Sequence, residues 1–370
     1  MPINPATRAD SPSDSAKPAA AIDPRLLEIP EGQRDVTVVQ QIDGLSYIDP
    51  TDAAMPSYRV IANNRQPVAL RDTMILPVRT GYIGQDRAKP DPALVPPSGA
   101  EAVPDVDVTT VYLPVRDGVA RCLVYRPTAA GAAAELPVIL YAHGGGFTVG
   151  SAEDTDYITR RLAVDNDAVV VSANYRLAPE YPFPTPLDDV TDVYEWLLRQ
   201  AERIGGDAAR IAVAGDSAGS NFAAALPIAA RARGRAAPRA VLMFGAFVDF
   251  AQERWPSFQQ EAPRGIVYDS AFFGFIRGAY LPTTPWTEPT ASPLYADLTG
   301  YPPTFIATGT HDPIVDSAQE FARLLSMHGG TVDGYWPEGM PHGFYFFPGV
   351  QQPEGDIAFE RAKAFLSAHL

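Results

Sequence analysis

Nearly continuous apolar runs alternate with amphipathic stretches from about residue 137 to the end of the chain. Such runs are typical of parallel strands that are buried on both faces. The apolar runs are Pro137–His143, Ala168–Asn174, Arg210–Gly215, Ala240–Phe247 and Pro303–Gly309. The amphipathic stretches predict helices over Thr155–Val164, Pro186–Ile204, Ala218–Arg233, Ser317–His328 and Asp356–His369. The repeated order of strand, helix and strand predicts a doubly wound α/β sheet.

The part of the chain before this alternation has a different character. Thr110–Val115 and Ala120–Tyr125 flank Asp117-Gly118, a pattern that predicts a β-hairpin. Upstream, the proline-rich stretch Ala88–Pro104 indicates a linker, and the mixed stretch Val36–Tyr82 indicates short helices only weakly. The residues before these have no apolar periodicity and are expected to form a flexible arm.

One segment, Ala251–Thr290, interrupts the alternation and is dense in aromatic residues and prolines. It is too long for an ordinary connection, which usually takes ~2 to 6 residues. It is either a surface helix and loop that pack on the core, or a lid that walls an apolar pocket. The lid is favoured because long insertions at the carboxyl ends of strands commonly shape ligand sites.

Composition excludes several classes of protein. The chain has 370 residues, of which 46% are hydrophobic and 20% charged, so it can bury a large core. Its net charge of −15 argues against binding to nucleic acid or to an anionic membrane surface. No run approaches the ~18 to 20 apolar residues of a membrane span, and the N-terminus lacks a secretory apolar stretch. The single cysteine, Cys122, excludes an internal disulfide and a thiolate zinc site, and a cytoplasmic protein without cofactors is expected.

The strongest chemical signal is Gly215-Asp216-Ser217-Ala218-Gly219, between a predicted strand and a predicted helix. A sharp strand-to-helix turn needs small residues on both sides of the serine, and it projects the Ser217 hydroxyl from the edge of the sheet. The helix N-terminus behind it favours developing negative charge. The alternative is a tight turn whose serine only caps the helix. This context favours Ser217 as a nucleophile.

A second signal, His143-Gly144-Gly145-Gly146-Phe147, comes directly after the strand residues Pro137–Ala142. Three glycines allow the backbone to approach a ligand closely and to direct N–H groups into a cavity. An oxyanion hole needs such donors ~3 Å from the tetrahedral oxygen. A flexible glycine turn is the alternative, but the serine motif Gly215–Gly219, about seventy residues later in the chain, makes that alternative less favoured.

A serine nucleophile needs a base, and the chain has five histidines. His342 lies on a late loop at the sheet edge and is the best candidate. His143 is expected to hold the glycine turn by hydrogen bonding, and His328 ends a helix, where a cation suits the dipole. His369 is at the C-terminus, and His311 would have to point away from the acid beside it. A loop histidine that only faces solvent is the alternative for His342.

The base needs an acid that orients the imidazole and stabilises its charge. Asp312 follows the strand Pro303–Gly309 and is expected to begin a helix, whereas Asp316 lies one helical turn further on. Helix capping is the alternative role for Asp312. Asp312 is favoured because the carboxyl ends of strands collect catalytic groups. The order Ser217, Asp312, His342 is that of the α/β hydrolases.

Together these motifs resemble the bacterial hormone-sensitive lipase-like family of esterases, in the branch whose elbow reads GDSAG. The resemblance extends from about Pro104 to Leu370 and is specific only in combination. Roughly 100 residues precede it, more than this family is expected to have. Its other matching segments are Asn174–Glu180 with the YPFPTPLDD that follows, Ser292–Leu294, Asp312–Ile314 and His342–Phe344.

The resemblance implies an α/β-hydrolase fold, a doubly wound and mostly parallel eight-stranded sheet with a cap subdomain. Residues 104–250 and 291–370 would form the catalytic core and 251–290 a cap insertion, with 1–103 as an N-terminal arm and part of the cap. It also implies oxyanion-hole amides from Gly145, Gly146 and Ala218, and no metal or organic cofactor. Arg176 and Glu180 are expected to tie loops near the site.

The predicted function is that of a serine carboxylesterase acting on short- to medium-chain esters through an acyl-enzyme. Two alternatives are a hydrolase of amides, lactones or acetyl groups with the same triad, and a silent small-molecule receptor. Plant gibberellin receptors resemble this family but lose the triad histidine, which this chain keeps. Candidate pocket walls, most of which can equally be core residues, are Phe147, Trp255, Phe273, Tyr280 and Phe344, with Phe272 and Phe275 as further aromatics.

The expected partner is a small-molecule ester, with no nucleic acid and no membrane span. Dimers are common in the resembled family, usually through the last strand and helix. Thr331–Trp336 and Ala358–Leu370 would form such a homodimer here, although no residue in them requires it.

Overall fold

The computed structural model describes residues 102–130, 135–264, 270–346 and 353–370. The expectations for the N-terminal arm, for Val36–Tyr82 and for nearly all of Ala88–Pro104 therefore lie outside the described residues. None of the helices in the described ranges combines the length and the apolar character needed to cross a membrane.

The described chain is built on an eight-stranded sheet with the strand order β1-β2-β4-β3-β5-β6-β7-β8. The pairs β1–β2 and β2–β4 are antiparallel and the other pairs are parallel, which confirms the predicted hairpin and the mostly parallel sheet. The strands are β1 (Val106–Val115), β2 (Gly118–Pro127), β3 (Leu136–Ala142), β4 (Val169–Ala173), β5 (Gly206–Asp216), β6 (Ala240–Phe244), β7 (Thr304–Ala307) and β8 (Val332–Tyr335).

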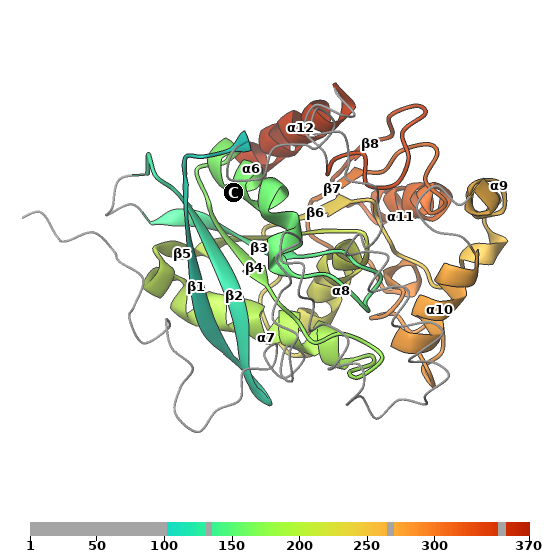
Figure 1. The fold of residues 1–370 in the computed structure, drawn as a ribbon, viewed down its shortest axis with the longest axis horizontal. Coiled ribbons are helices and arrows are strands. Elements are labelled where there is room, and N and C mark those ends of the chain that lie inside the picture. Colours follow the sequence, from blue (N-terminus) through green and yellow to red (C-terminus); the bar gives the residue numbers. More distant parts are fainter. Residues whose placement is uncertain (1–101, 131–134, 265–269, 347–352) are drawn as a thin grey trace, which may run out of the picture.

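Helices cover both faces of the sheet (Figure 1). α6 and α12 pack on one face, whereas α7, α8 and α11 pack on the other, as in a doubly wound sheet. The helices are α6 (Asp156–Asp165), α7 (Thr185–Gln200), α8 (Ala218–Ala232), α9 (Pro256–Glu261), α10 (Ser270–Tyr280), α11 (Val315–Met327) and α12 (Glu354–His369).

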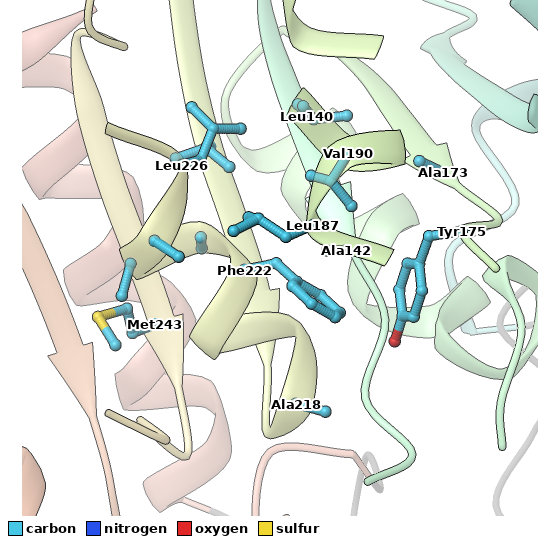
Figure 2. Close-up of a cluster of buried hydrophobic side chains, with 14 of the residues drawn as sticks. Leu140, Ala142, Ala173, Tyr175, Leu187, Val190, Ala218, Phe222, Leu226 and Met243 are labelled. Carbon is cyan, nitrogen blue, oxygen red and sulfur yellow. The ribbon is translucent and has the colours of Figure 1, made fainter. Parts of the chain in front are cut away.

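The strands read as continuous apolar runs because both of their faces are buried. In β3, Val138 and Leu140 belong to the core on the α7–α8 face, and Ile139 and Tyr141 belong to the core on the α6–α12 face. Figure 2 shows the first of these cores, where Phe222 of α8 lies beside Tyr175. These two rings meet edge to face at 4.7 Å between centroids. The buried apolar area of both faces stabilises the sheet and fixes where its strand ends lie.

Some predicted boundaries were wrong by a few residues, for local reasons. The strand predicted over Ala240–Phe247 ends at Phe244, because Gly245 adopts a φ of 62° and turns the chain out of the sheet. The helix that Asp312 was expected to begin starts only at Val315. Asp312 therefore lies on the loop between β7 and α11.

The insertion (residues 251–290) contains α9 and α10 beside short 3₁₀ turns. In Figure 1 these two helices lie at the end of the molecule beyond α8 and α11. Phe273 and Tyr280 of α10 are fully buried and join the core on the α7–α8 face. The insertion therefore packs on the sheet domain through its own apolar side chains.

A buried ion pair connects the loop after β4 to α7. Nε and Nη2 of Arg176 donate to the two carboxylate oxygens of Asp189 at 2.9 and 2.7 Å, and the backbone N–H of Arg176 donates to Oδ2 at 3.0 Å. The side chains are 7% and 1% exposed. Arg176 therefore ties a loop, as expected, and the buried Asp189 is its main partner beside the exposed Asp117, whose Oδ2 lies 3.3 Å from Nη1.

We expect Asp189→Ala to lower the free energy of unfolding by about 3 to 5 kcal/mol, because it leaves the Arg176 guanidinium buried without its main partner. Glu320→Ala is the matched control, since Glu320 pairs with Arg323 on the exposed side of α11 and should change stability by about 0.5 kcal/mol or less. Denaturant unfolding monitored by circular dichroism measures both. Equal losses in the two variants would contradict this assignment.

Candidate active site

Ser217 lies on the sharp turn between β5 and α8 and adopts φ 52° and ψ −118°. A non-glycine residue in this region is strained by about 1 to 3 kcal/mol. Ser217 is partly exposed, whereas Asp216 and Ala218 on either side of it are buried. A Cβ at Gly219 would overlap the carbonyl oxygen of Ala142, and one at Gly215 would overlap the backbone of Gly219. The spacing of the motif thus reflects a turn into which only glycine fits.

Hydrogen bonds from neighbouring segments hold the strained turn. The backbone N–H of Ser217 donates to the carbonyl of Phe244 at 2.8 Å. The hydroxyl of Ser220 lies 2.5 Å from the carbonyl oxygen of Ser217 and 3.1 Å from that of Gly245, and it accepts from the N–H of Phe247 at 2.9 Å. The turn is therefore tied to the segment that follows β6.

Residues 143–147, called the oxyanion loop here because they are predicted to supply an oxyanion hole, follow β3, which is the neighbour of β5 in the sheet. Gly145 and Gly146 have φ values of 115° and 57°, and a Cβ at Gly145 would overlap the carbonyl of Val149. Because parallel strands end at the same edge, the loop and Ser217 lie at one edge of the sheet. Ala218 is the first residue of α8, so its N–H has no partner within the helix. Loop and helix can thus offer N–H groups to one developing negative charge.

His143 supports the oxyanion loop from inside, as expected. Its ring stacks on Tyr175 with 4.2 Å between centroids, and Nδ1 lies 2.7 Å from the carbonyl oxygen of Gly144. The hydroxyl of Tyr175 donates to the carbonyl of His143 at 2.6 Å. Burial lowers the pKa of His143 to about 4. This imidazole is therefore neutral near pH 7.

Asp312 and His342 form a buried pair. Oδ2 of Asp312 lies 2.6 Å from Nδ1 of His342, and the residues are 0% and 8% exposed. Burial alone would lower the pKa of His342, but the charge and hydrogen bond of Asp312, with the charge of Asp216, outweigh it and raise that pKa above 6.5. A Cβ on Gly245 would lie 2.9 Å from Cε1 of His342, so this ring borders the segment that holds Ser217.

The structure separates Asp312 from its rival Asp316. Oδ2 of Asp316 accepts a hydrogen bond from the backbone N–H of Ser257 at 2.8 Å, and the N–H of Asp316 lies 3.2 Å from the Ser257 hydroxyl. These reciprocal bonds attach the start of α9 to α11. Asp316 therefore binds the insertion, and Asp312 faces the histidine.

The three other histidines lie in different surroundings. Nδ1 of His311 lies 3.2 Å from Oε1 of Glu261 at the end of α9, and Nδ1 of His328 lies 2.9 Å from the carbonyl of Leu324. The ring of His369 packs on Phe365 at 4.5 Å. Across the described residues, no group of three or more His, Cys, Asp and Glu side chains is arranged to hold a metal ion.

The five candidate wall residues lie in three different environments. Phe147, Phe273 and Tyr280 are fully buried in the α7–α8 core, where Phe147 stacks on Tyr280 at 4.2 Å. Phe344 is buried on the α6–α12 face, against Tyr345. Trp255 donates its indole N–H to Asp249 at 2.8 Å and lines an outer hollow with Arg254 and other residues. Their role in substrate binding stays a prediction.

The residues of α10 that approach Gly146 of the oxyanion loop are Phe272 and Ile276. A Cβ at Gly146 would lie 3.0 Å from Cγ2 of Ile276 and 3.2 Å from Cζ of Phe272. Sequence reasoning missed Ile276 and gave Phe272 no priority over its neighbours. Helical periodicity was the available signal, because residues 272 and 276 share a face of α10, whereas Phe273 points to the core.

Comparison with known proteins identifies the fold family of this chain. A family model described as alpha/beta hydrolase fold matches residues 139–346. Carboxylesterase NlhH of Mycobacterium tuberculosis is 38% identical over 216 residues, covering 57% of this chain and 67% of that protein. The ethyl acetate hydrolase of Pseudomonas putida is 34% identical over 250 residues, covering 66% and 76%. The solved structure of carboxylesterase EstE1, cloned from a metagenomic library, aligns with a TM-score of 0.68 and 33% identity over 82% of this chain and 98% of that chain.

The lowered pKa of His143 predicts a loss of stability in acid. The unfolded chain binds a proton at this residue near pH 6.5, whereas the folded chain does so only near pH 4. Folding therefore opposes protonation, and the stability that this residue contributes is lost as the pH falls through 6.5, by about 3 kcal/mol at pH 4.

We expect His143→Asn to flatten this part of the stability profile, because asparagine does not titrate. Denaturant unfolding of both proteins between about pH 7 and pH 4.5 measures the difference in slope. Parallel profiles for the two proteins would show that the pKa of His143 is the same in the folded and the unfolded chain, which would contradict this prediction.

Proposed function

Because this chain belongs to the alpha/beta hydrolase fold family, and within it to the bacterial esterases that resemble hormone-sensitive lipase, we propose that it is a serine carboxylesterase. The observation that carries the proposal is the buried 2.6 Å contact between Asp312 and His342 at the sheet edge that also bears Ser217. Assignment to the GDSAG branch remains a prediction from the motif.

Ser217 is the proposed nucleophile and His342 its general base. Nδ1–H of His342 donates to Asp312, so Nε2 is the unprotonated nitrogen that accepts the proton of the Ser217 hydroxyl. As Oγ attacks the ester carbonyl, the imidazole becomes an imidazolium, and the charge of Asp312 stabilises it. Asp312 itself keeps its charge and holds the ring in the useful tautomer.

The tetrahedral oxyanion is stabilised by the N–H groups of Gly145, Gly146 and Ala218. The left-handed φ values of the two glycines and the position of Ala218 at the start of α8 support this role. Loss of one such donor typically raises the barrier by about 3 to 4 kcal/mol. His342 then returns its proton to the leaving alcohol, and a water molecule activated by the same base releases the acid from Ser217.

The substrate class proposed is short- to medium-chain carboxylic esters. The approach of Phe272 and Ile276 to Gly146 supports an apolar wall close to the reacting carbonyl. The name of the Pseudomonas putida relative, ethyl acetate hydrolase, also favours esters with short acyl chains. A small-molecule ester is therefore the proposed partner, and a homodimer through β8 and α12 stays a prediction.

Wild type should hydrolyse p-nitrophenyl esters with turnover that peaks at short or medium acyl chains, and Ser217→Ala should lose at least about 10⁴-fold in kcat. A series from acetate to palmitate, measured by release of p-nitrophenolate, gives both results. Equal or faster rates on the longest chains would contradict the substrate class. A matched anilide hydrolysed faster than its ester would contradict the esterase assignment.

Asp312→Asn should lower kcat by about 10³- to 10⁴-fold and move the acid limb of kcat/KM to lower pH. The reason is that only neutral His342 acts as base, and Asp312 supplies the charge that raises the pKa of His342. Asp316→Asn is the matched control and should keep both the plateau and the limb. Rate profiles between about pH 5 and pH 9 test the pair, and a larger loss in Asp316→Asn would reverse the assignment of the acid.

A further inference from the structure

A buried carboxyl group, that of Asp216, lies between the serine turn and the oxyanion loop. Asp216 is the last residue of β5 and is 0% exposed. Its Oδ1 accepts hydrogen bonds from the hydroxyl of Tyr141 at 2.6 Å and from the backbone N–H of Gly144 at 3.0 Å. Its Oδ2 has no hydrogen-bond partner in the part of the chain that the structure describes. The proposed acyl transfer uses neither oxygen.

The oxyanion loop needs an anchor because its three glycines give the backbone little conformational preference of its own. The N–H of Gly144 precedes the two loop donors directly, so its orientation limits the directions in which Gly145 and Gly146 point. A Cβ at Gly144 would overlap Oδ2 of Asp216. The close contact with the carboxyl group therefore explains why the first residue of the triplet is also glycine.

We propose that Asp216 is a positioning residue for the oxyanion loop and acts as a hydrogen-bond acceptor, not as a charge. The inference rests on the proposed esterase function. Asp216 precedes the nucleophile in the chain and binds the first glycine of the loop. The side chain of Asp216 thus fixes the position of the N–H groups on the loop relative to the N–H group of Ala218, which belongs to a different segment.

The distribution of donors explains why a charge is not needed. Both donors bind Oδ1, so a proton on Oδ2 leaves both hydrogen bonds intact. Burial raises the pKa of Asp216 to about 7, so the group changes its charge close to neutral pH while the anchor persists. The titratable groups that act on this carboxyl or on its direct partners are Tyr141, Tyr175, Asp312, His342 and Tyr345.

The test compares Asp216→Ala, which removes the acceptor, with Asp216→Asn, which keeps Oδ1 and removes the charge. Rates on p-nitrophenyl butyrate are measured on the alkaline plateau, where His342 is neutral, and are expressed per active site titrated with diethyl p-nitrophenyl phosphate. We expect Asp216→Ala to lower kcat about 100-fold with KM within about threefold. The reason is that a displaced oxyanion donor loses its hydrogen bond to the transition state and hardly affects binding of the substrate. Asp216→Asn should keep kcat within about fivefold.

Tyr141→Phe is the matched control, because it removes the other donor to Oδ1 and leaves the bond to Gly144. It should stay near wild type, and a loss equal to that of Asp216→Ala would contradict the proposal by implicating general packing. Wild-type kcat in Asp216→Ala, or an equally slow Asp216→Asn, would also overturn it. If the alanine variant does not fold, Asp216→Val fills the space without an acceptor and takes its place.

Ser217→Ala is assayed in parallel and expressed per mole of protein, because it lacks the serine that the phosphate ester titrates. It separates failure of the proposed function from failure of the role assigned to Asp216. Full activity in Ser217→Ala would show that the proposed function itself is wrong. An inactive Ser217→Ala beside a fully active Asp216→Ala would contradict only the role of Asp216.

Discussion

The site depends on one steric constraint, the contact between the end of β3 and the turn that follows β5. The carbonyl of Ala142 leaves no room for a side chain at Gly219, and Gly215 is equally confined. The chain can pass this point only in a tight turn, which places Ser217 at a positive φ and leaves it partly exposed. Packing and the bonds to Phe244 and Ser220 oppose the strain. Because β3 runs directly into the oxyanion loop, the same contact brings nucleophile and loop together.

The insertion is bound to the segment that carries the proposed acid, in addition to lying over the oxyanion loop. The Ser257 hydroxyl donates to the carbonyl of Pro313 at 2.9 Å, and Asp316 accepts from the Ser257 N–H. At the other end of α9, Glu261 contacts His311. These contacts lie on both sides of Asp312 in the sequence. Movement of α9 would therefore disturb the loop that orients the imidazole. The insertion and the proposed acid Asp312 are thus connected through these hydrogen bonds.

The sheet could be predicted from the sequence because burial on both faces leaves a continuous apolar run, and the proposed triad because its members follow strand ends. The choice of Asp312 over Asp316 was predicted from the position of Asp312 after a strand end, and the path of the loop supplies the contact with His342 behind it. Two features could not be predicted. Phe272 and Phe273 are neighbours with the same side chain, but a helical step of about 100° sends one to the oxyanion loop and the other to the core. In the sequence, Asp216 is only a small residue of the serine turn, and its positioning role is indicated by the hydrogen bond from Gly144.

The carboxyl groups of Asp312 and Asp216 both act on the His342 imidazole, and burial of Asp216 limits their combined negative charge. Asp312 must be charged, because it orients and stabilises the His342 imidazolium. A second permanent charge at Asp216 would raise the pKa of His342 further and leave less neutral base near pH 7. No cation contacts Asp216 among the described residues, and burial raises its pKa to about 7, so it can take up a proton. An acceptor that works in both protonation states anchors the loop without fixing a second charge beside the base.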